Sequence, residues 1–248
     1  MSAEAVIISG LEKSYPGSEQ PAVKGIDLTI SQGEFFGLLG PNGAGKSTTI
    51  AMLSGLMDPD SGTIEILEQA MGRNRKKVKA LFGLVPQEIA LYETLSGREN
   101  LRFFGRLYNI KNDLLKDRIE FCLDFSGLNK RADKQASTYS GGMKRRLNLA
   151  IALLHEPRIL FLDEPTVGID AQSRQLIHSR LQELVDGGVT IIYTTHYMEE
   201  AEHLCSRVAI IDQGRILDSG SPGSLNENHQ SSNLEETFFQ LTGKGLRD

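Results

Sequence analysis

A glycine-rich segment ending in lysine and serine has the residue types and spacing of a phosphate-binding loop: Gly40-Pro41-Asn42-Gly43-Ala44-Gly45-Lys46-Ser47. It follows the apolar run Phe35–Leu39 and precedes a helical pattern, which is the context that such a loop needs. Glycines let backbone amides turn towards phosphate oxygens, and the helix dipole adds positive potential. We expect Lys46 to contact the β- and γ-phosphates and Ser47 to bind Mg²⁺. The segment therefore predicts nucleotide binding.

Two adjacent carboxylates, Asp163 and Glu164, follow the apolar run Ile159–Leu162. A bound triphosphate needs a carboxylate to orient Mg²⁺, and its hydrolysis needs a group that positions and polarises water. Asp163 fits the first role and Glu164 the second. By itself the pair could equally be an acidic turn at a strand end, but together with the phosphate loop it predicts hydrolysis.

A guanine-specific enzyme is the nearest rival among proteins with such a loop, and these usually carry Asn-Lys-x-Asp. Asn129-Lys130-Arg131-Ala132 has alanine where the aspartate belongs. Guanine specificity is therefore unsupported.

Two kinds of strand are expected to position these residues. Alternating apolar and polar residues in Val6–Ile8, Ile26–Ile30 and Ile64–Ile66 predict half-buried strands, usually antiparallel with one wet face. Continuous apolar runs predict parallel strands covered on both faces: Phe35–Leu39, Ile159–Leu162, Val189–Tyr193 and Val208–Ile211. We therefore expect a small antiparallel sheet beside a larger α/β core.

Between about Pro86 and Glu156 the period becomes helical. A capping box begins at Ser96, a second helical stretch stops near Gly127, and a third begins after Ser140. These features predict a mostly helical insertion in the α/β core. Nearer the end, Ser221–Asn233 is expected to be a polar loop, and Leu234, Phe238 and Leu241 predict a short closing helix.

Composition narrows the class of protein. The 248 residues are 40% hydrophobic and carry 27 basic and 32 acidic residues, for a net charge of -5, which argues against a basic nucleic-acid coat. The longest apolar run, Leu149–Leu154, is far shorter than the roughly 20 residues of a membrane-spanning helix. Ala5–Ile8 lacks the features of a signal peptide, and Cys122 and Cys205 are expected to be reduced core residues. We expect a soluble, cytoplasmic protein.

One basic cluster, Arg73-Asn74-Arg75-Lys76-Lys77-Val78-Lys79, has two interpretations. It could touch acidic lipid or nucleic acid. A solvated helix face is favoured because the whole chain is acidic.

A second candidate phosphate-binding helix start is Ser140, which can cap a helix whose first residues, Gly141 and Gly142, expose amides to an anion. With Tyr139-Ser140-Gly141-Gly142-Met143-Lys144-Arg145-Arg146 the sequence resembles the ATP-binding cassette (ABC) ATPases, and the likeness extends over nearly the whole chain. It includes the phosphate loop, Leu162-Asp163-Glu164-Pro165, Val85-Pro86-Gln87, Gly168-Ile169-Asp170 and Thr194-Thr195-His196.

The resemblance implies a P-loop NTPase core of class α/β with an N-terminal antiparallel β subdomain and an inserted helical subdomain at about 87–156. It places the ATPase domain at 1–220 and a short tail with a helix at 221–248. ATP and Mg²⁺ are the implied ligands. The implied Mg²⁺ ligands are Ser47, Gln87 and Asp163, and the implied catalytic groups are Glu164, His196, Gln87 and Lys46.

In the family, nucleotide contacts extend from the phosphate loop, here Gly40 to Thr48, to Tyr15, which resembles the aromatic residue that stacks on adenine. Ser140, Gly141 and Gly142 resemble the residues that complete the ATP site of another subunit, so that two ATPs lie in a head-to-tail homodimer, and Asp170 resembles the residue that crosses the dimer interface. His196 resembles the switch histidine at the γ-phosphate, and Gln87 the glutamine that senses the transport partner.

Tyr139 and Met143 replace the leucine and glutamine of the usual Leu-Ser-Gly-Gly-Gln signature, a departure that looks like the drug- and polymer-efflux exporter branch. The resemblance then implies an ATPase subunit without nucleic-acid partners, peripheral on the cytoplasmic face of the membrane. It would drive a separate integral-membrane permease docked on the helical insertion. The alternative is a soluble, non-transport ABC ATPase that acts as a switch in translation, repair or cluster assembly. The cargo would bind the permease, so drug, lipid, polysaccharide and ion export all stay open.

Overall fold

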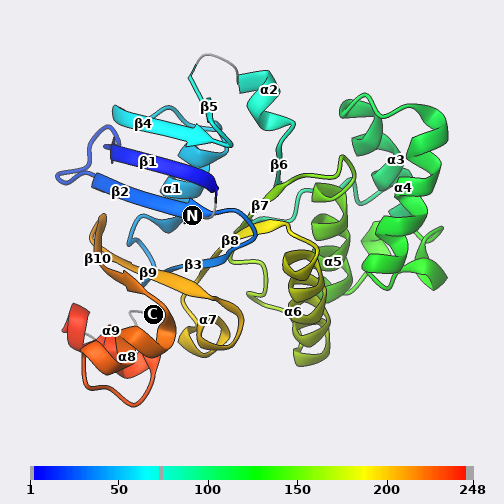
Figure 1. The fold of residues 1–248 in the computed structure, drawn as a ribbon. Coiled ribbons are helices and arrows are strands. Elements are labelled where there is room, and N and C mark those ends of the chain that lie inside the picture. Colours follow the sequence, from blue (N-terminus) through cyan, green and yellow to red (C-terminus); the bar gives the residue numbers. More distant parts are fainter. Residues whose placement is uncertain (1–2, 73–74, 244–248) are drawn as a thin grey trace.

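The computed structural model describes residues 3–72 and 75–243 and builds them into two β-sheets with helices around them (Figure 1). The smaller sheet has the order β2-β1-β4-β5, and its neighbouring strands are antiparallel. Its strands are β1 (Glu4–Lys13), β2 (Val23–Ser31), β4 (Ser61–Ile66) and β5 (Gln69–Ala70). In β2, Ile26, Leu28 and Ile30 are buried while Asp27 and Thr29 are exposed, so the predicted half-buried strands are confirmed.

The larger sheet has the order β10-β9-β3-β8-β7-β6 and is parallel except for β10, which runs antiparallel to β9. Its strands are β3 (Phe35–Leu39), β6 (Phe82–Val85), β7 (Ile159–Asp163), β8 (Thr190–Thr195), β9 (Arg207–Asp212) and β10 (Arg215–Gly220). Every residue of β3, β7 and β8 is buried, as expected for strands covered on both faces. The α/β prediction is confirmed, whereas β6 and β10 have no continuous apolar run long enough to reveal them.

The register of the parallel strands determines which candidate site residues lie close together. Leu39 pairs with Thr195, Asp163 pairs with Thr194, and Val85 pairs with Leu162. The carboxyl ends of four strands therefore lie at one edge of the sheet, and ligands of open α/β sheets bind at that edge.

The helical insertion consists of α3 (Gly97–Leu107), α4 (Asn112–Phe125) and α5 (Gly141–Ala152). In Figure 1, α3 and α4 lie farthest from the sheets, and α5 lies between them and the larger sheet. The predicted capping box is present, because Glu99 N donates to Ser96 Oγ at 3.2 Å and Ser96 N donates to Glu99 Oε2 at 2.8 Å. The prediction of a helical insertion is therefore confirmed.

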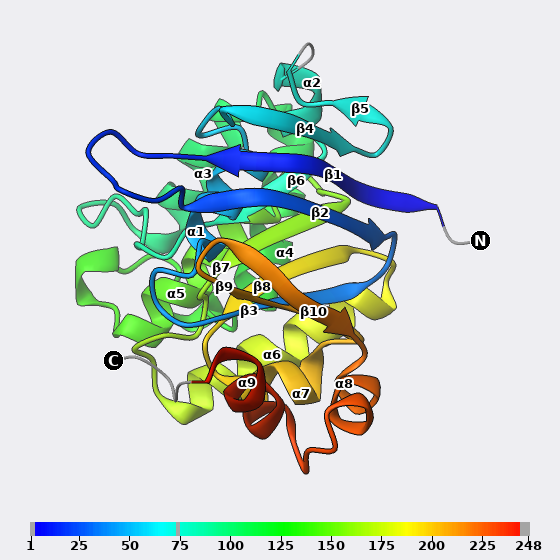
Figure 2. The same cartoon turned by 90° about the vertical axis from the view of Figure 1, so that its left-hand side faces the viewer.

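The expected loop at Ser221–Asn233 is wrong, because the helix α8 (Pro222–Asn228) occupies most of it. Ser221 Oγ accepts a hydrogen bond from Ser224 N at 3.2 Å, and Pro222 stands in the first turn, where it is tolerated. Apart from Pro222, Leu225 is the only buried residue of α8, so no apolar period was visible. The closing helix α9 (Leu234–Thr242) is confirmed, and Figure 2 shows α8 and α9 below the larger sheet, near α7 (Met198–Leu204).

Two apolar cores hold these layers together. One lies around α1 (Lys46–Leu53) and the smaller sheet, and the other joins the helical insertion, α6 (Ala171–Asp186) and the last two helices to the larger sheet. Cys122 and Cys205 are buried free thiols; burial raises the pKa of Cys122 to about 12 and also raises the pKa of Cys205.

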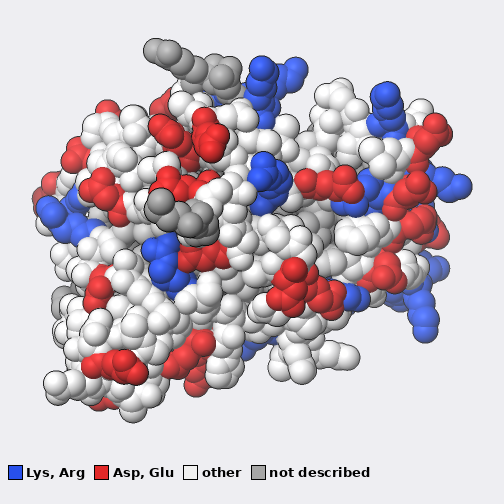
Figure 3. All heavy atoms as spheres, in the orientation of Figure 1, with Lys and Arg blue, Asp and Glu red and all other residues white. Residues whose placement is uncertain are grey.

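The surface mixes both signs of charge, and Figure 3 shows acidic and basic side chains interspersed over one face. Of the basic cluster, Arg73 and Asn74 lie outside the described residues, and the rest forms α2 (Arg75–Lys79) with Val78 buried and Lys76, Lys77 and Lys79 exposed. Within 3–72 and 75–243, no helix has the length and apolarity needed to span a bilayer.

The packing of α8 gives a stability prediction. Leu225 is 1% exposed, so Leu225→Ala should lower the free energy of unfolding by about 2–5 kcal/mol in urea denaturation. Leu56→Ala, at a side chain that is 69% exposed, is the matched control and should change it by less than about 0.5 kcal/mol. Equal effects of the two variants would contradict the packing of α8 on the core.

Candidate nucleoside triphosphate site

The phosphate loop joins the end of β3 to the start of α1 and walls one side of a cavity of about 470 Å³. Residues 42–48 line this cavity together with Tyr15, Ala22, Gln87 and Glu164. Gly43 and Gly45 have φ angles of +79° and +111°, a region that other residues rarely adopt. The loop thus takes the turned conformation that directs backbone amides towards an anion.

Lys46 is 4% exposed and its ammonium group has several acceptors. Nζ donates to Gly40 O at 2.8 Å and to Pro41 O at 3.2 Å, and it lies 3.1 Å from Glu164 Oε1. The cation is therefore held at the cavity wall by the loop itself and by a carboxylate from another strand.

Glu164 is also 4% exposed, and its carboxylate lies between two basic side chains. Oε1 faces Lys46, and Oε2 lies 3.3 Å from Nδ1 of His196, which comes from the end of β8. Its φ of +47° is unusual for a residue with a side chain, and such strained backbone is concentrated at functional sites. Glu164 is thus fixed at the cavity by contacts from the loop and from β8.

Thr194 holds both acidic residues, and the sequence did not single it out. Its hydroxyl donates to Asp163 Oδ1 at 2.7 Å and accepts from Glu164 N at 2.9 Å. Asp163 and Thr194 are paired neighbours in the sheet, which brings the hydroxyl to both groups. The one sequence signal for this role of Thr194 is that a threonine lies in an otherwise apolar run.

Tyr15 and Thr48 mark the outer end of the cavity. The Tyr15 hydroxyl lies 3.1 Å from Thr48 Oγ1, within hydrogen-bonding distance, and the Tyr15 side chain is 41% exposed. The predicted base-stacking ring thus lies beside the phosphate loop, on the same cavity.

Gln87 is held by a residue of α5 that sequence reasoning also missed. Arg145 donates to Pro86 O at 3.0 Å and to Gln87 O at 2.8 Å, and its side chain is buried. Burial lowers the pKa of Arg145, and the nearby Asp163 charge opposes that shift. Arg145 therefore connects the helix that starts at Ser140 to the loop that brings Gln87 to the cavity.

The second helix start forms as expected. Ser140 Oγ accepts from Met143 N at 3.2 Å, and Gly141 is exposed. A Cβ on Gly142 would lie 2.2 Å from Ser173 Oγ and 2.8 Å from Asp170 Oδ2, so this glycine allows close packing on α6. Asp170 caps α6 by accepting from Ser173 N at 2.8 Å, and this hydrogen bond lowers its pKa.

The two elements predicted to bind phosphate are separate within one chain. Among the described residues, those lining the phosphate-loop cavity do not include Ser140, Gly141, Gly142 or Asp170. Of the residues predicted to contact ATP, Tyr15 and residues 42–48 line the cavity, and Gly40 and Pro41 accept hydrogen bonds from Lys46 instead. The others lie at the starts of α5 and α6.

A third buried acidic residue, Glu200, was not singled out by the sequence. Its Oε2 accepts from Tyr193 Oη at 2.7 Å and from Thr166 Oγ1 at 2.9 Å, and burial raises the pKa of Tyr193. On the other side, Oε1 lies 3.4 Å from Arg174 Nε and 3.7 Å from His178 Nε2. Glu200 thus ties the segment after Glu164 to β8 and α6.

Comparison with known proteins gives consistent matches. A family model described as ABC transporter matches residues 23–167. Linearmycin resistance ATP-binding protein LnrL of Bacillus subtilis (strain 168) is 47% identical over 239 residues, covering 96% of this chain and 75% of that protein. Nod factor export ATP-binding protein I of Rhizobium sp. (strain N33) is 44% identical over 238 residues, covering 96% of this chain and 78% of that protein.

Several solved structures have a fold similar to that of this chain. An ATP binding subunit of an ABC transporter matches with a TM-score of 0.87 and 28% identity, over 96% of this chain and 99% of that one. A dimeric post-hydrolysis state of an ATP-binding cassette, bound to ADP and Pi, matches with a TM-score of 0.80 and 26% identity, over 87% of this chain and 98% of that one. The similarity thus includes both the sheets and the helical insertion.

The hydrogen-bond network of Glu200 predicts an effect on the rate of ATP hydrolysis, although Glu200 is not expected to contact ATP. Glu200→Gln should lower kcat for ATP hydrolysis about 10- to 100-fold, because the amide keeps only one of the two acceptor oxygens that hold Thr166 and Tyr193 and loses the charge that faces Arg174. The dissociation constant for ATP, measured with a fluorescent analogue, should change less than about threefold. Glu199→Gln, on the exposed neighbour, is the control. A parallel loss of ATP binding and of folding in Glu200→Gln would indicate a purely structural role.

Proposed function

Because the chain belongs to the ABC transporter family, in which it is an ATP-binding and ATP-hydrolysing subunit, we propose that its ATP site is the phosphate-loop cavity, with Glu164 as the general base. The observation that carries this proposal is the buried Glu164 carboxylate, which lines the cavity 3.1 Å from Lys46 Nζ. The glycine-rich loop accounts for phosphate binding, and Tyr15 lies where it can stack on the base.

In this proposal the chain's own groups divide the hydrolytic work. Lys46 balances the charge of the β- and γ-phosphates, and Glu164 accepts a proton from the attacking water. His196 lies next to Glu164, where its ring can contact the γ-phosphate and help to orient the water. Gln87 lines the same cavity and supplies an amide to that water.

Mg²⁺ fits the donor set that the chain offers. Ser47, Gln87 and Asp163 provide oxygen ligands, and Asp163 Oδ2 has no protein partner in the part of the chain that is described. A single carboxylate with neutral oxygens suits an ion that keeps several waters and phosphate oxygens as ligands. When bound, the ion supplies charge neutralisation at the phosphates.

We further propose that two copies form a head-to-tail dimer in which Ser140, Gly141 and Gly142 of one copy face the phosphate loop of the other. The support is that Ser140 and Gly141 are exposed at a capped helix start, and that none of the three residues lines the cavity of their own described chain. Asp170, at the start of the adjacent α6, is then a residue of the shared interface. Among the similar structures, an ATP-binding cassette is dimeric.

The membrane subunit and the direction of transport belong to the same proposal. The relatives are named for linearmycin resistance and Nod factor export, which favours an exporter over a soluble switch in translation, repair or cluster assembly. A similar solved structure, cbiO1 from Clostridium perfringens, is described as part of a transporter complex; it has a TM-score of 0.82, 28% identity and 96% coverage of both chains. We propose that the chain sits on the cytoplasmic face of the membrane and drives a separate permease through its helical insertion.

The role of Glu164 predicts a separation of binding from turnover. Glu164→Gln should lower the hydrolysis rate at least about 100-fold, because the amide cannot accept the proton of water. ATP binding should persist, and the ATP-dependent dimer should accumulate in gel filtration. Glu65→Gln, on an exposed residue of β4, is the control. Near-normal turnover of Glu164→Gln would remove this residue from the base role.

The shared site predicts complementation between two inactive variants. Gly141→Asp has room, since the nearest atom to a Cβ there is Gly168 O at 3.9 Å, but its charge would repel the phosphate of the opposing copy. Gly141→Asn is the uncharged control. Gly141→Asp should abolish turnover without weakening ATP binding to the monomer, and Lys46→Ala should abolish turnover through the phosphate loop.

Mixing the two variants should restore activity, because a mixed dimer has one site made of two intact halves. Random pairing gives mixed dimers in about half of the pairs, so up to roughly a quarter of wild-type activity is expected when one site suffices. Absence of any restoration, with mixed dimers shown by two affinity tags, would contradict the shared site.

A further inference from the structure

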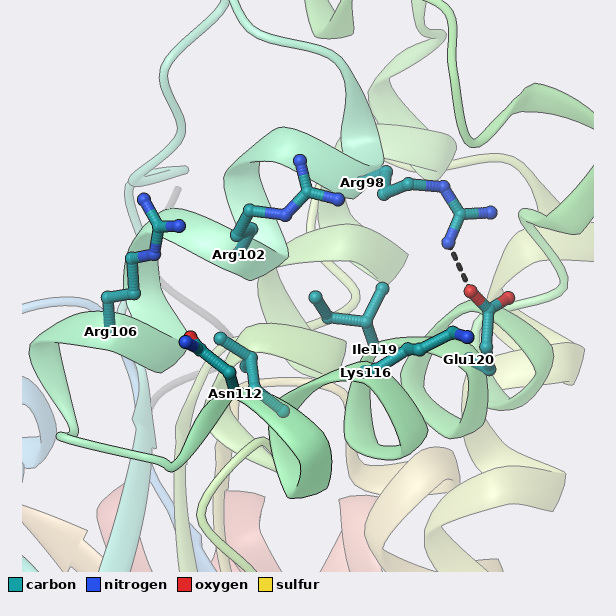
Figure 4. Close-up of a pocket in the computed structure, with 8 residues that line it drawn as sticks. Arg98, Arg102, Arg106, Asn112, Lys116, Ile119 and Glu120 are labelled. Carbon is teal, nitrogen blue, oxygen red and sulfur yellow. Dashed lines mark hydrogen bonds and ion pairs between the residues drawn. The ribbon is translucent and has the colours of Figure 1, made fainter.

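A second cavity, of about 310 Å³, lies between α3 and α4 and shares no lining residue with the ATP cavity. Figure 4 shows Arg98, Arg102 and Arg106 following one another along α3, with Lys116 and Glu120 along the neighbouring α4. Asn112, Leu115 and Ile119 complete the lining. We name this cavity the α3–α4 cleft.

The arginines of the cleft differ in their partners. Arg98 forms ion pairs with Glu120 and with Asp133, and its pKa is raised chiefly by the hydrogen bond to Glu120. In the part of the chain that is described, Arg102 and Arg106 form no ion pair, and both are exposed. Two guanidinium groups at one end of the cleft are thus available to a ligand.

The packing of α3 against α4 does not require the positive charge of the cleft. Gly105 already lets the two helices approach closely, since a Cβ there would lie 2.2 Å from Leu115 Cδ1, and the Arg98–Glu120 pair joins them farther along. The lining has four basic residues and one acidic residue in a chain of net charge -5. Like charges one helical turn apart destabilise a helix slightly, and Arg102, unlike Arg98 and Arg106, has neither an ion pair in the described residues nor a place in the last turn to offset this.

The N-terminus of α4 is a second feature that favours binding of an anion in the cleft. Lys111, its N-cap residue, makes no side-chain cap, so the first amides of a 14-residue helix receive no acceptor from it. Asn112, in that first turn, lines the cleft beside Arg106, and Asp113 is the one acidic residue of the turn. Uncapped helix starts attract anions, and here two arginines lie next to one.

We propose that the α3–α4 cleft binds a phosphate group, carried by an anionic phospholipid or by a soluble phosphate ester. Guanidinium groups match phosphate oxygens in paired hydrogen bonds, and the apolar floor of Leu115 and Ile119 suits the carbon part of such a ligand. Phe103 and Leu107 are exposed on α3 beside Arg102 and Arg106, an arrangement of basic and apolar residues that favours the lipid. This site is independent of the ATP site proposed above.

The test uses the purified chain carrying Lys46→Ala, so that the phosphate loop contributes nothing. One arm measures flotation with phosphatidylcholine vesicles, with and without phosphatidylglycerol, and the other measures binding of glycerol 3-phosphate by calorimetry. The double variant Arg102→Gln/Arg106→Gln should weaken binding about tenfold or more in whichever arm detects it. Lys76→Gln/Lys77→Gln, which removes the same charge from α2, should leave binding unchanged.

The two arms of the experiment distinguish the two sources of the phosphate group. Arginine-dependent binding to anionic vesicles alone identifies the lipid, and arginine-dependent binding of glycerol 3-phosphate identifies a soluble ester. Binding that depends on Lys76 and Lys77 instead, or no binding in either arm, would overturn the proposal and leave the cleft to an acidic segment of a partner protein. Thermal unfolding of the double variant serves as the folding control.

Discussion

The contact between Lys46 and Glu164 is the interaction on which the rest of the site depends. Both side chains are 4% exposed and their charged atoms lie 3.1 Å apart. A buried charge is costly without compensation, and each group supplies part of it for the other, in addition to two carbonyls at Lys46 and His196 at Glu164. Lys46 begins α1 after the loop that follows β3, and Glu164 follows β7. Because β8 joins β3 and β7 in the sheet, the parallel register of these strands brings the two residues together.

Around this pair, three side chains connect the site to other parts of the fold through hydrogen bonds. Thr194 fixes Asp163 and the backbone of Glu164, Glu200 ties Thr166 to β8 and α6, and Arg145 ties the loop of Gln87 to α5. Each of them uses a buried charge or hydroxyl that forms at least two hydrogen bonds to these segments, and such networks restrict movement. A movement of α5 relative to the sheet would therefore change the position of Gln87, which links the helical insertion to the phosphate-loop cavity.

The placement of the phosphate loop and of the helix start at Ser140 also bears on the proposed dimer. In one chain the phosphate loop and the helix start at Ser140 belong to different surfaces, and Gly142 is packed against α6 rather than against the cavity. A second copy supplies the simplest way to bring both elements onto one triphosphate. The α3–α4 cleft lies apart from both, on the helices expected to meet the membrane partner, so an anion bound there would act on the insertion and not on ATP directly.

The sequence by itself determined the elements whose signals are local. The phosphate loop, the alternating and continuous strands and the cap at Ser96 each depend on neighbouring residues, because glycine conformation, strand burial and capping act over a few positions. Only the tertiary structure decided the partners of Thr194, Arg145 and Glu200, because these contacts join segments far apart in the chain and follow from strand register and helix packing. It also decided α8, where Leu225 is the only buried residue besides Pro222 and so left no periodic signal.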